Sequence, residues 1–168
     1  LRIESQANEV HKLATMYEMF DVTYDETTID QERKLVKMHE PDGHPDILQQ
    51  VEHGILTILG GYRNLGRLYR GIIVPTLQQY KHLGDFSTQT DNLHYDDSLA
   101  AGEHTATHSG AEDDRLVFTE ENPGREYTGI AALAIAGRVM TDHNQSLAEE
   151  SVAAAEELWR RERPEGEG

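Results

Sequence analysis

The side chains best suited to chemistry gather in one long polar segment, residues 84–124. The segment is rich in Asp, Glu, His, Asn and Thr, which hydrogen-bond to hydroxyl groups or ligate cations. Loops beyond roughly a dozen residues are uncommon in compact domains and are usually functional or disordered. This loop contains isolated apolar residues, such as Leu93 and Val117, whose side chains can be buried. We therefore expect an ordered surface loop that carries the functional site.

The histidines and carboxylates of this segment also fit a metal site. His104 and His108 are four residues apart, a spacing that lets two imidazoles share one metal on a helical face. Thr105, Thr107 and Gly110 are poor helix formers, which disfavours a transition metal. Calcium takes oxygen ligands from several points of a loop and stays open as an alternative. We expect no other cofactor.

Composition limits the classes of partner. The chain has 168 residues, of which 37% are hydrophobic and 27% charged, values typical of a soluble globular protein. A net charge of -16 disfavours nucleic acid or an anionic membrane as partner, because both would be repelled. The absence of cysteine excludes disulfides, thiolate nucleophiles and cysteine zinc sites. No apolar run approaches the roughly twenty residues that a membrane span needs.

Two amphipathic helices are predicted in the first half of the chain. Apolar residues recur at three- and four-residue steps up to Phe20, which indicates a helix that ends near Asp21. A wider stripe from Ile47 to Leu65 predicts a core helix, with Asp46 capping its start. Gly54, Gly60 and Gly61 each weaken such a helix by up to about 1 kcal/mol, so we expect a close neighbour or a substrate-facing backbone that compensates.

The connections and later helices follow from their start and stop signals. Residues 22–45 predict a connector with one short helix at 29–38, and Pro75 begins another short helix that Gly84 ends. Residues 123–140 form an alanine-rich helical pattern. Ser146 and Glu149 make a capping box that opens a last helix through Trp159.

No alternating strand pattern is visible, so we predict an all-α fold. The last two predicted helices are joined by about five residues and should pack as an antiparallel pair. A bundle, a superhelical repeat and part of an α/α toroid all remain possible architectures. The lack of a fixed period disfavours the repeat. The long polar loop favours the toroid, and residues 164–168 are expected to be a tail.

Four strings, in order along nearly the whole chain, resemble the cellulase-like enzymes of glycoside hydrolase family 9. They are Pro-Asp-Gly-His-Pro-Asp-Ile-Leu-Gln-Gln-Val-Glu-His-Gly at residues 41–54, Leu-Tyr-Arg-Gly-Ile-Ile at 68–73, Asp-Asp-Arg-Leu-Val-Phe-Thr at 113–119, and the stretch 122–159. In the last, a Pro-Gly turn leads into an alanine-rich helix and then into a helix that ends near an aromatic residue.

The resemblance implies part of an (α/α)6 barrel that hydrolyses β-linked glucan-type or amino-sugar oligosaccharides with inversion, in a secreted or periplasmic protein that degrades polysaccharide. The family has its general base in an Asp-Ala-Gly-Asp motif and its general acid in a Glu near the C-terminus. Neither signature occurs in this sequence, and the resemblance places them before Leu1 and after Gly168. Residues 1–163 are therefore expected to be an interior fragment of the catalytic domain, without catalytic residues and inactive without the remainder of that domain.

The resemblance also implies residues that contact sugar. The family has an Asp-His pair after a Gly-Asp in its cleft loop, and the matching pair here is Asp91-Asn92, with Asn in place of His. Arg115 matches an Arg that faces the cleft, and its guanidinium suits vicinal hydroxyls. The candidate substrate-binding residues are Asp91, Asn92, His94, Tyr95, Arg115 and Phe118. For each, a loop-stabilising hydrogen bond or local packing is the alternative.

Three other residues receive structural interpretations. We expect Glu52 to be solvated or paired with Arg63 or Arg67, and His53 to be a core or helix-end residue rather than a cleft residue. Trp159 continues the stripe of its helix and is expected in the core.

Two hypotheses make different predictions for the apolar faces. An arc of a larger ring leaves faces such as those of Ile55, Leu59 and Leu133 exposed. The rival hypothesis is a non-catalytic helical module whose acidic loop binds a partner or calcium. It predicts a well-folded monomer.

Overall fold

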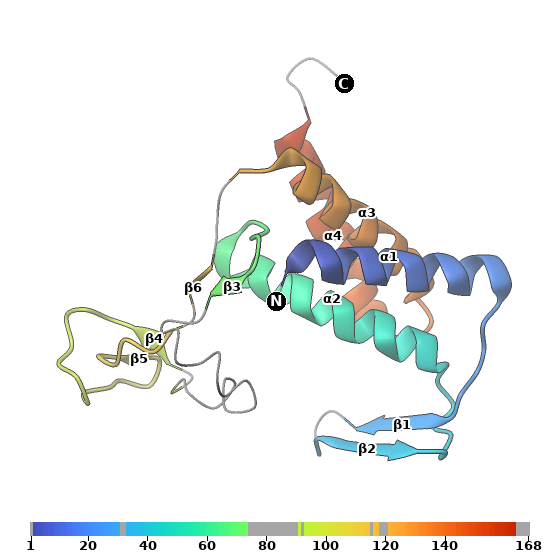
Figure 1. Cartoon of the computed structure of the whole chain (residues 1–168), viewed down its shortest axis with the longest axis horizontal. Coiled ribbons are helices and arrows are strands. Elements are labelled where there is room, and N and C mark those ends of the chain that lie inside the picture. Colours follow the sequence, from blue (N-terminus) through green and yellow to red (C-terminus); the bar gives the residue numbers. More distant parts are fainter. Residues whose placement is uncertain are drawn as a thin grey trace. The chain divides into compact units, whose positions relative to one another are not determined.

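The structure is a computed structural model that describes residues 2–30, 33–73, 91, 93–114, 116–117 and 121–163. It divides into two compact units. The helical unit comprises residues 2–70 and 120–168 and contains the four helices labelled in Figure 1. The loop unit comprises Leu1 and residues 71–119, and its described elements are short strands.

The first two helices confirm the predicted stripes. Helix α1 (Ile3–Phe20) ends at Asp21, whose left-handed backbone lets its N–H bond to the carbonyl oxygen of Tyr17. Helix α2 (Asp46–Leu65) ends at Gly66 in the same way. The predicted cap at Asp46 is wrong. Its carboxylate instead accepts hydrogen bonds from the N–H groups of Glu26 and Thr27, because the preceding chain folds back over the helix start.

Gly54 allows α1 and α2 to approach closely, as expected. A Cβ atom at this position would collide with the Cγ2 atom of Val10 on α1. Both positions lie on buried helix faces. The stability that glycine costs the isolated helix is thus offset by close packing between helices.

Helices α3 (Pro123–Val139) and α4 (Gln145–Glu162) form the predicted antiparallel pair. Gly137, late in α3, lies against Val152, and the Tyr127 hydroxyl, early in α3, donates to the backbone oxygen of Glu162. The predicted capping box is wrong, because the cap of α4 is Asn144, whose side chain accepts from the N–H of Leu147. The sequence offers several polar residues at this point, and Asn144 is an equally good cap.

The helices cover one another's apolar faces. Helix α1 packs against both α2 and α3, and α3 packs against α4. Side chains that are fully buried include Val10, Val51, Ile55, Ile58, Leu59, Leu68, Leu133, Met140 and Leu158. The expectation that Ile55, Leu59 and Leu133 are exposed is therefore wrong.

Trp159 is not a core residue, contrary to prediction. Its side chain is 49% exposed, and its ring lies 5.7 Å from that of Tyr127. The stripe of α4 ends instead at the neighbouring Leu158, which is fully buried.

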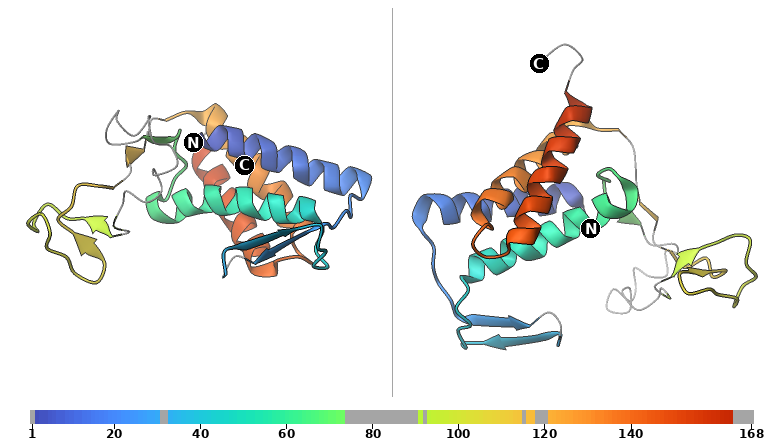
Figure 2. Two further views of the ribbon diagram at one scale, coloured as in Figure 1. Left: turned by 60° about the horizontal axis from the view of Figure 1, so that its bottom comes forward. Right: turned by 180° about the vertical axis from the view of Figure 1, so that it is seen from behind.

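The predicted helix at 29–38 is wrong, because this segment is a β-hairpin. Strand β1 (Thr27–Asp30) pairs antiparallel with β2 (Leu35–Met38), with Thr27 opposite Met38. β-Branched residues favour strand over helix here, and Lys34 takes the left-handed backbone of a turn. Figure 2 shows the hairpin beside the start of α2.

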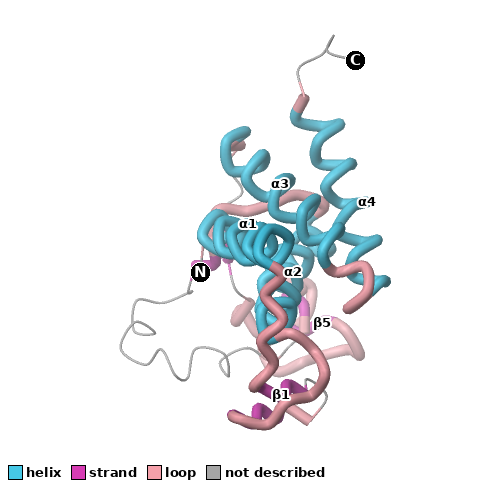
Figure 3. The backbone as a smooth tube through the Cα atoms, turned by 90° about the vertical axis from the view of Figure 1, so that its right-hand side faces the viewer, coloured by secondary structure: helices cyan, strands magenta, loops and turns pink. Residues whose placement is uncertain are grey.

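The loop unit contains two short pairs of strands. Strand β3 (Ile72–Ile73) pairs antiparallel with β6 (Leu116–Val117), and β4 (His94–Tyr95) pairs parallel with β5 (His108–Ser109). The all-α prediction is thus corrected to a mostly helical fold with small sheets (Figure 3). The helix predicted from Pro75 and the tail at 164–168 lie outside the described residues.

No helix within the described ranges combines the length and the apolar character that crossing a membrane requires.

Candidate functional site

Strand β4 carries two of the predicted sugar-binding residues. Its parallel pairing places His94 opposite His108, with ring centroids 5.7 Å apart. His94 and Tyr95 are both exposed, Tyr95 by 42%. Their side chains are therefore available to a ligand. Asn92, Arg115 and Phe118 lie outside the described residues.

Carboxylates of the loop unit bind its own backbone. The carboxylate of Asp113 accepts a hydrogen bond from the N–H of Asp91 at 2.7 Å. The carboxylate of Asp114 accepts one from the N–H of Tyr95, also at 2.7 Å. Asp91 in turn accepts from the N–H of Leu93 at 2.8 Å. A hydrogen bond from Ser109, followed by that from Leu93, lowers the pKa of Asp91. These contacts favour the loop-stabilising alternative for Asp91 and leave His94 and Tyr95 as the accessible pair.

The spacing of His104 and His108 does not produce a helical metal site. Gly102 has a left-handed backbone, and His104 forms an isolated β-bridge with Ser109. His108 Nδ1 lies 2.9 Å from the Thr107 hydroxyl. Across the described part of the chain, no three His, Asp or Glu side chains converge in a way that could hold a metal ion. The calcium alternative gains no support there.

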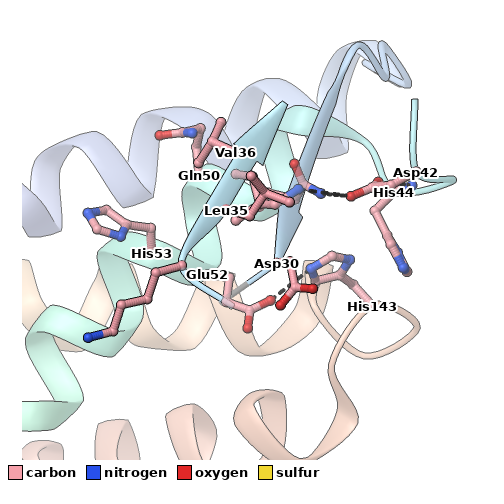
Figure 4. A pocket seen from close by; sticks show the side chains of 12 residues that line it. Asp30, Leu35, Val36, Asp42, His44, Gln50, Glu52, His53 and His143 are labelled. Atoms are coloured by element: carbon pink, nitrogen blue, oxygen red, sulfur yellow. Dashed lines mark hydrogen bonds and ion pairs between the residues drawn. The ribbon is translucent and has the colours of Figure 1, made fainter. Parts of the chain in front are cut away.

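A larger cavity lies in the helical unit, at the N-terminal end of α2. It encloses about 610 Å³ between the β1–β2 hairpin, α2 and the turn that joins α3 to α4. In Figure 4, Leu35 and Val36 of the hairpin and Glu52, His53 and His143 of the helical part surround the same space. This volume is in the range that small ligands occupy.

Glu52 and His143 form the polar floor of this cavity. His143 Nε2 lies 2.9 Å from one carboxylate oxygen of Glu52, and Asn144 Nδ2 donates to the other at 3.2 Å. The His143 side chain is only 8% exposed and that of Glu52 20% exposed. The predicted pairing of Glu52 with Arg63 is wrong, because Arg63 binds Glu150 on α4.

His53 belongs to the cavity lining, contrary to the expectation of a core or helix-end residue. It lies on α2 one residue after Glu52, and its side chain is exposed. The sequence could have suggested this from the polar pair Glu52-His53 beside the apolar stripe of α2. No neighbouring residue in the sequence indicated that His143 contacts Glu52, because the two are 91 residues apart.

Asp42 and Gln49 form a second polar contact of the same cavity. Gln49 Nε2 donates to Asp42 Oδ2 at 2.7 Å. Burial acts to raise the pKa of Asp42, but hydrogen bonds from the backbone N–H groups of His44 and Ile29 and from Gln49 outweigh it and lower the pKa. Asp42 therefore stays ionised in the cavity wall.

The opposite end of the helical unit contains a buried carboxyl group. Glu126, in the first turn of α3, is 2% exposed and borders a smaller cavity of about 340 Å³. Arg161 Nη2 is 3.8 Å from one of its oxygens, and neither oxygen accepts a hydrogen bond. Burial and, next, the charge of Glu162 raise the pKa of Glu126.

Comparison with solved structures shows a related fold. The chain is similar to a metagenome-derived glycoside hydrolase family 9 endoglucanase, with a TM-score of 0.58 and 19% sequence identity. The similarity covers 95% of this chain and 23% of that chain, so this chain spans about a quarter of the enzyme's length. No family model matches the sequence, and no curated protein matches it. The mostly helical fold is consistent with part of a helical barrel.

Proposed function

We propose that this chain is part of a glycoside hydrolase of the family 9 type and contributes subsites for a β-linked glucan or amino-sugar chain. The observation that carries the proposal is the fold similarity to the family 9 endoglucanase, which extends over 95% of the chain. The four ordered sequence strings also support it, because they depend on residue identities and not on the fold.

In this proposal the catalytic pair comes from sequence beyond this chain. Inverting hydrolysis needs two carboxyl groups roughly 6.5–9.5 Å apart, one that protonates the leaving oxygen and one that activates water. The family's Asp-Ala-Gly-Asp motif is absent from the sequence. The chain therefore binds and orients sugar, and the remainder of the catalytic domain performs the bond cleavage. Export to the periplasm or the medium, where polysaccharide is met, belongs to the same proposal.

The sugar contacts are assigned to the exposed face of the loop unit. Tyr95 offers a flat aromatic surface to a pyranose ring, and the adjacent His94 offers a ring nitrogen to a hydroxyl group. Asp91 holds the loop through its hydrogen bonds with Leu93 and Ser109. In this proposal it acts by positioning His94 and Tyr95. Asn92, Arg115 and Phe118 complete the proposed contact set.

The proposal is tested by expressing the chain together with the coding sequence that adjoins it. We expect release of reducing ends from a soluble β-glucan or from a chitosan oligomer. The first product should be the α-anomer by proton NMR, because inversion changes the configuration at the cleaved carbon. Absence of activity on both substrates, or a β-anomeric first product, would overturn the proposal.

A variant pair tests the assignment to β4. Tyr95→Ala should lower kcat/KM about three- to tenfold through loss of stacking on the sugar ring. The control is Tyr24→Ala, since Tyr24 is 63% exposed but belongs to the helical unit. Equal effects of the two substitutions would remove Tyr95 from the subsite.

A further inference from the structure

The cavity at the start of α2 has chemistry that the proposed function does not use. All its lining residues belong to the helical unit, and it is larger than the cavity beside Glu126. Its wall combines an apolar side with a side rich in hydrogen-bond acceptors. These two sides define the ligand that would fit.

The apolar side comes from the hairpin. Ile29, Leu35 and Val36 line the cavity, and Leu35 and Val36 are 41% and 58% exposed. Figure 4 shows Leu35 and Val36 on the hairpin strand that faces the α2 residues. Apolar side chains left open to water favour a ligand with an apolar flank.

The polar side contains a buried acceptor without a partner. Gln49 donates its amide to Asp42, which leaves its Oε1 atom as a buried acceptor without a hydrogen bond. The Nδ1 atom of His143, whose Nε2 atom lies 2.9 Å from the Glu52 carboxylate, is likewise buried and without a hydrogen bond. Buried polar groups without partners are rare in native proteins and call for an explanation.

The charges of the lining are predominantly negative. Three carboxylates, Asp30, Asp42 and Glu52, line the cavity together with one ammonium group, that of Lys34. Arg33 lies 3.6 Å from Asp30, but its side chain is 81% exposed, so the pair is largely screened by solvent. An anionic ligand would be repelled here, and a ligand that supplies a cationic donor would be attracted.

We propose that this cavity binds a primary ammonium group on a small skeleton with an apolar flank. The ammonium group supplies three donors to the acceptor-rich floor, and the carbon skeleton packs on Leu35 and Val36. Amino sugars and short alkyl diamines both carry this chemistry. The experiment has one arm for each source.

The first measurement compares probes of matched length and different charge. Cadaverine, 1,5-pentanediol and glutarate are titrated into the chain, and the amide NMR shifts of α2 and the hairpin are followed. Cadaverine should bind saturably, about fivefold or more tightly than the diol, and its affinity should fall with added salt. Glutarate should not bind. In the second arm, glucosamine should bind more tightly than glucose because it carries the ammonium group. An affinity for glucosamine above that for cadaverine identifies an amino sugar as the ligand, and an affinity below it identifies a diamine.

Variants then separate the two sides of the wall. Asp30→Asn should weaken cadaverine about fivefold and leave the diol unchanged. Leu35→Ser should weaken both probes alike, and the exposed position of Leu35 makes the fold tolerant of this change. Glu9→Gln, on the exposed face of α1, is the matched charge control and should change neither.

Three results would overturn the proposal. They are no saturable cadaverine binding at millimolar concentration, equal affinity for diamine and diol, and an effect of Glu9→Gln as large as that of Asp30→Asn. Glycan hydrolysis is measured separately from these titrations. A failed binding site therefore leaves the proposed glycosidase role standing, and the reverse also holds.

Discussion

The helical unit and the loop unit place their carboxyl groups in opposite environments. In the loop unit, Asp91 is exposed and Asp96 is partly exposed, and hydrogen bonds, first from the side chains of Ser109 and Ser98, lower their pKa values. In the helical unit, burial raises the pKa of Glu126. The comparison shows that ionised carboxylates help to hold the loop unit, whereas apolar packing holds the helical unit even with a carboxyl group inside it.

The largest expected effect is the loss of a core side chain in the helical unit. Ile55→Ala should lower the free energy of unfolding by about 2–5 kcal/mol, because Ile55 is fully buried and the cavity it leaves cannot fully collapse. Urea denaturation followed by helical circular dichroism measures the loss. The control is Leu65→Ala on the same helix, where the side chain is 40% exposed. Similar losses at both positions would mean that packing does not dominate this unit.

Two glycines of α2 should respond to alanine with opposite signs. Gly54→Ala places a methyl group against Val10 and should destabilise the protein by about 1–3 kcal/mol. Gly60→Ala meets no atom within 4 Å and should stabilise it by about 0.4–1 kcal/mol, because alanine restricts the unfolded chain. The same urea titration measures both. Stabilisation by both substitutions would show that α1 moves away from α2 without cost.

The buried carboxyl group of the helical unit should make that unit less stable at neutral pH than in mild acid. The folded-state pKa of Glu126 is raised, so its contribution to stability is fully present below the unfolded-state pKa and is lost as the pH rises through the folded-state pKa. Glu126→Gln should therefore raise the unfolding free energy at pH 7 by about 1 kcal/mol. Near pH 4 the difference from the parent protein should vanish.

Glu121→Gln is the matched control for Glu126→Gln. Glu121 borders the same cavity but is exposed, and its substitution should have little effect at either pH. A Glu126→Gln variant that is less stable at pH 7 would show that the ionised carboxylate is stabilised there, with Arg125 and Arg161 as its cationic neighbours.

Local periodicity was enough to predict most of the helical unit. The stripe of α1, its end at Asp21, the extent of α2 and the start of α3 at Pro123 all follow from neighbouring residues. The errors arose where distant residues decide. Residues 29–38 form a hairpin, and its entry is held by Asp46, some twenty residues away in sequence.

The candidate sites show the same limit. Asp91, His94 and Tyr95 could be assigned to a polar loop from their composition. The sequence did not indicate that Asp91 binds the N–H of Leu93 and is itself held by Asp113, 22 residues away. The cavity of the helical unit was not predicted, because its lining runs from Ile29 to His143. The fold is similar to that of an endoglucanase, so a helical architecture of this kind could be predicted from the sequence strings, whereas sequence patterns gave no indication of the Glu52–His143 contact.

The smallest expected effect is local and lies in the loop unit. The folded-state pKa of Asp91 is lowered, so its contribution is present above the unfolded-state pKa and is lost as the pH falls through the folded-state pKa. Amide exchange at Leu93, whose N–H donates to Asp91, should therefore quicken in acid relative to the intrinsic rate. Asp91→Asn should remove this acid dependence of amide exchange at Leu93. The amide of Ser98, which donates to Asp96, should keep its acid dependence in this variant. Because Asp91 is exposed, global unfolding should change little. A Leu93 amide that stays equally protected as Asp91 is protonated would show that the loop is held by something other than its carboxylates, and the contrast with Glu126 would then disappear.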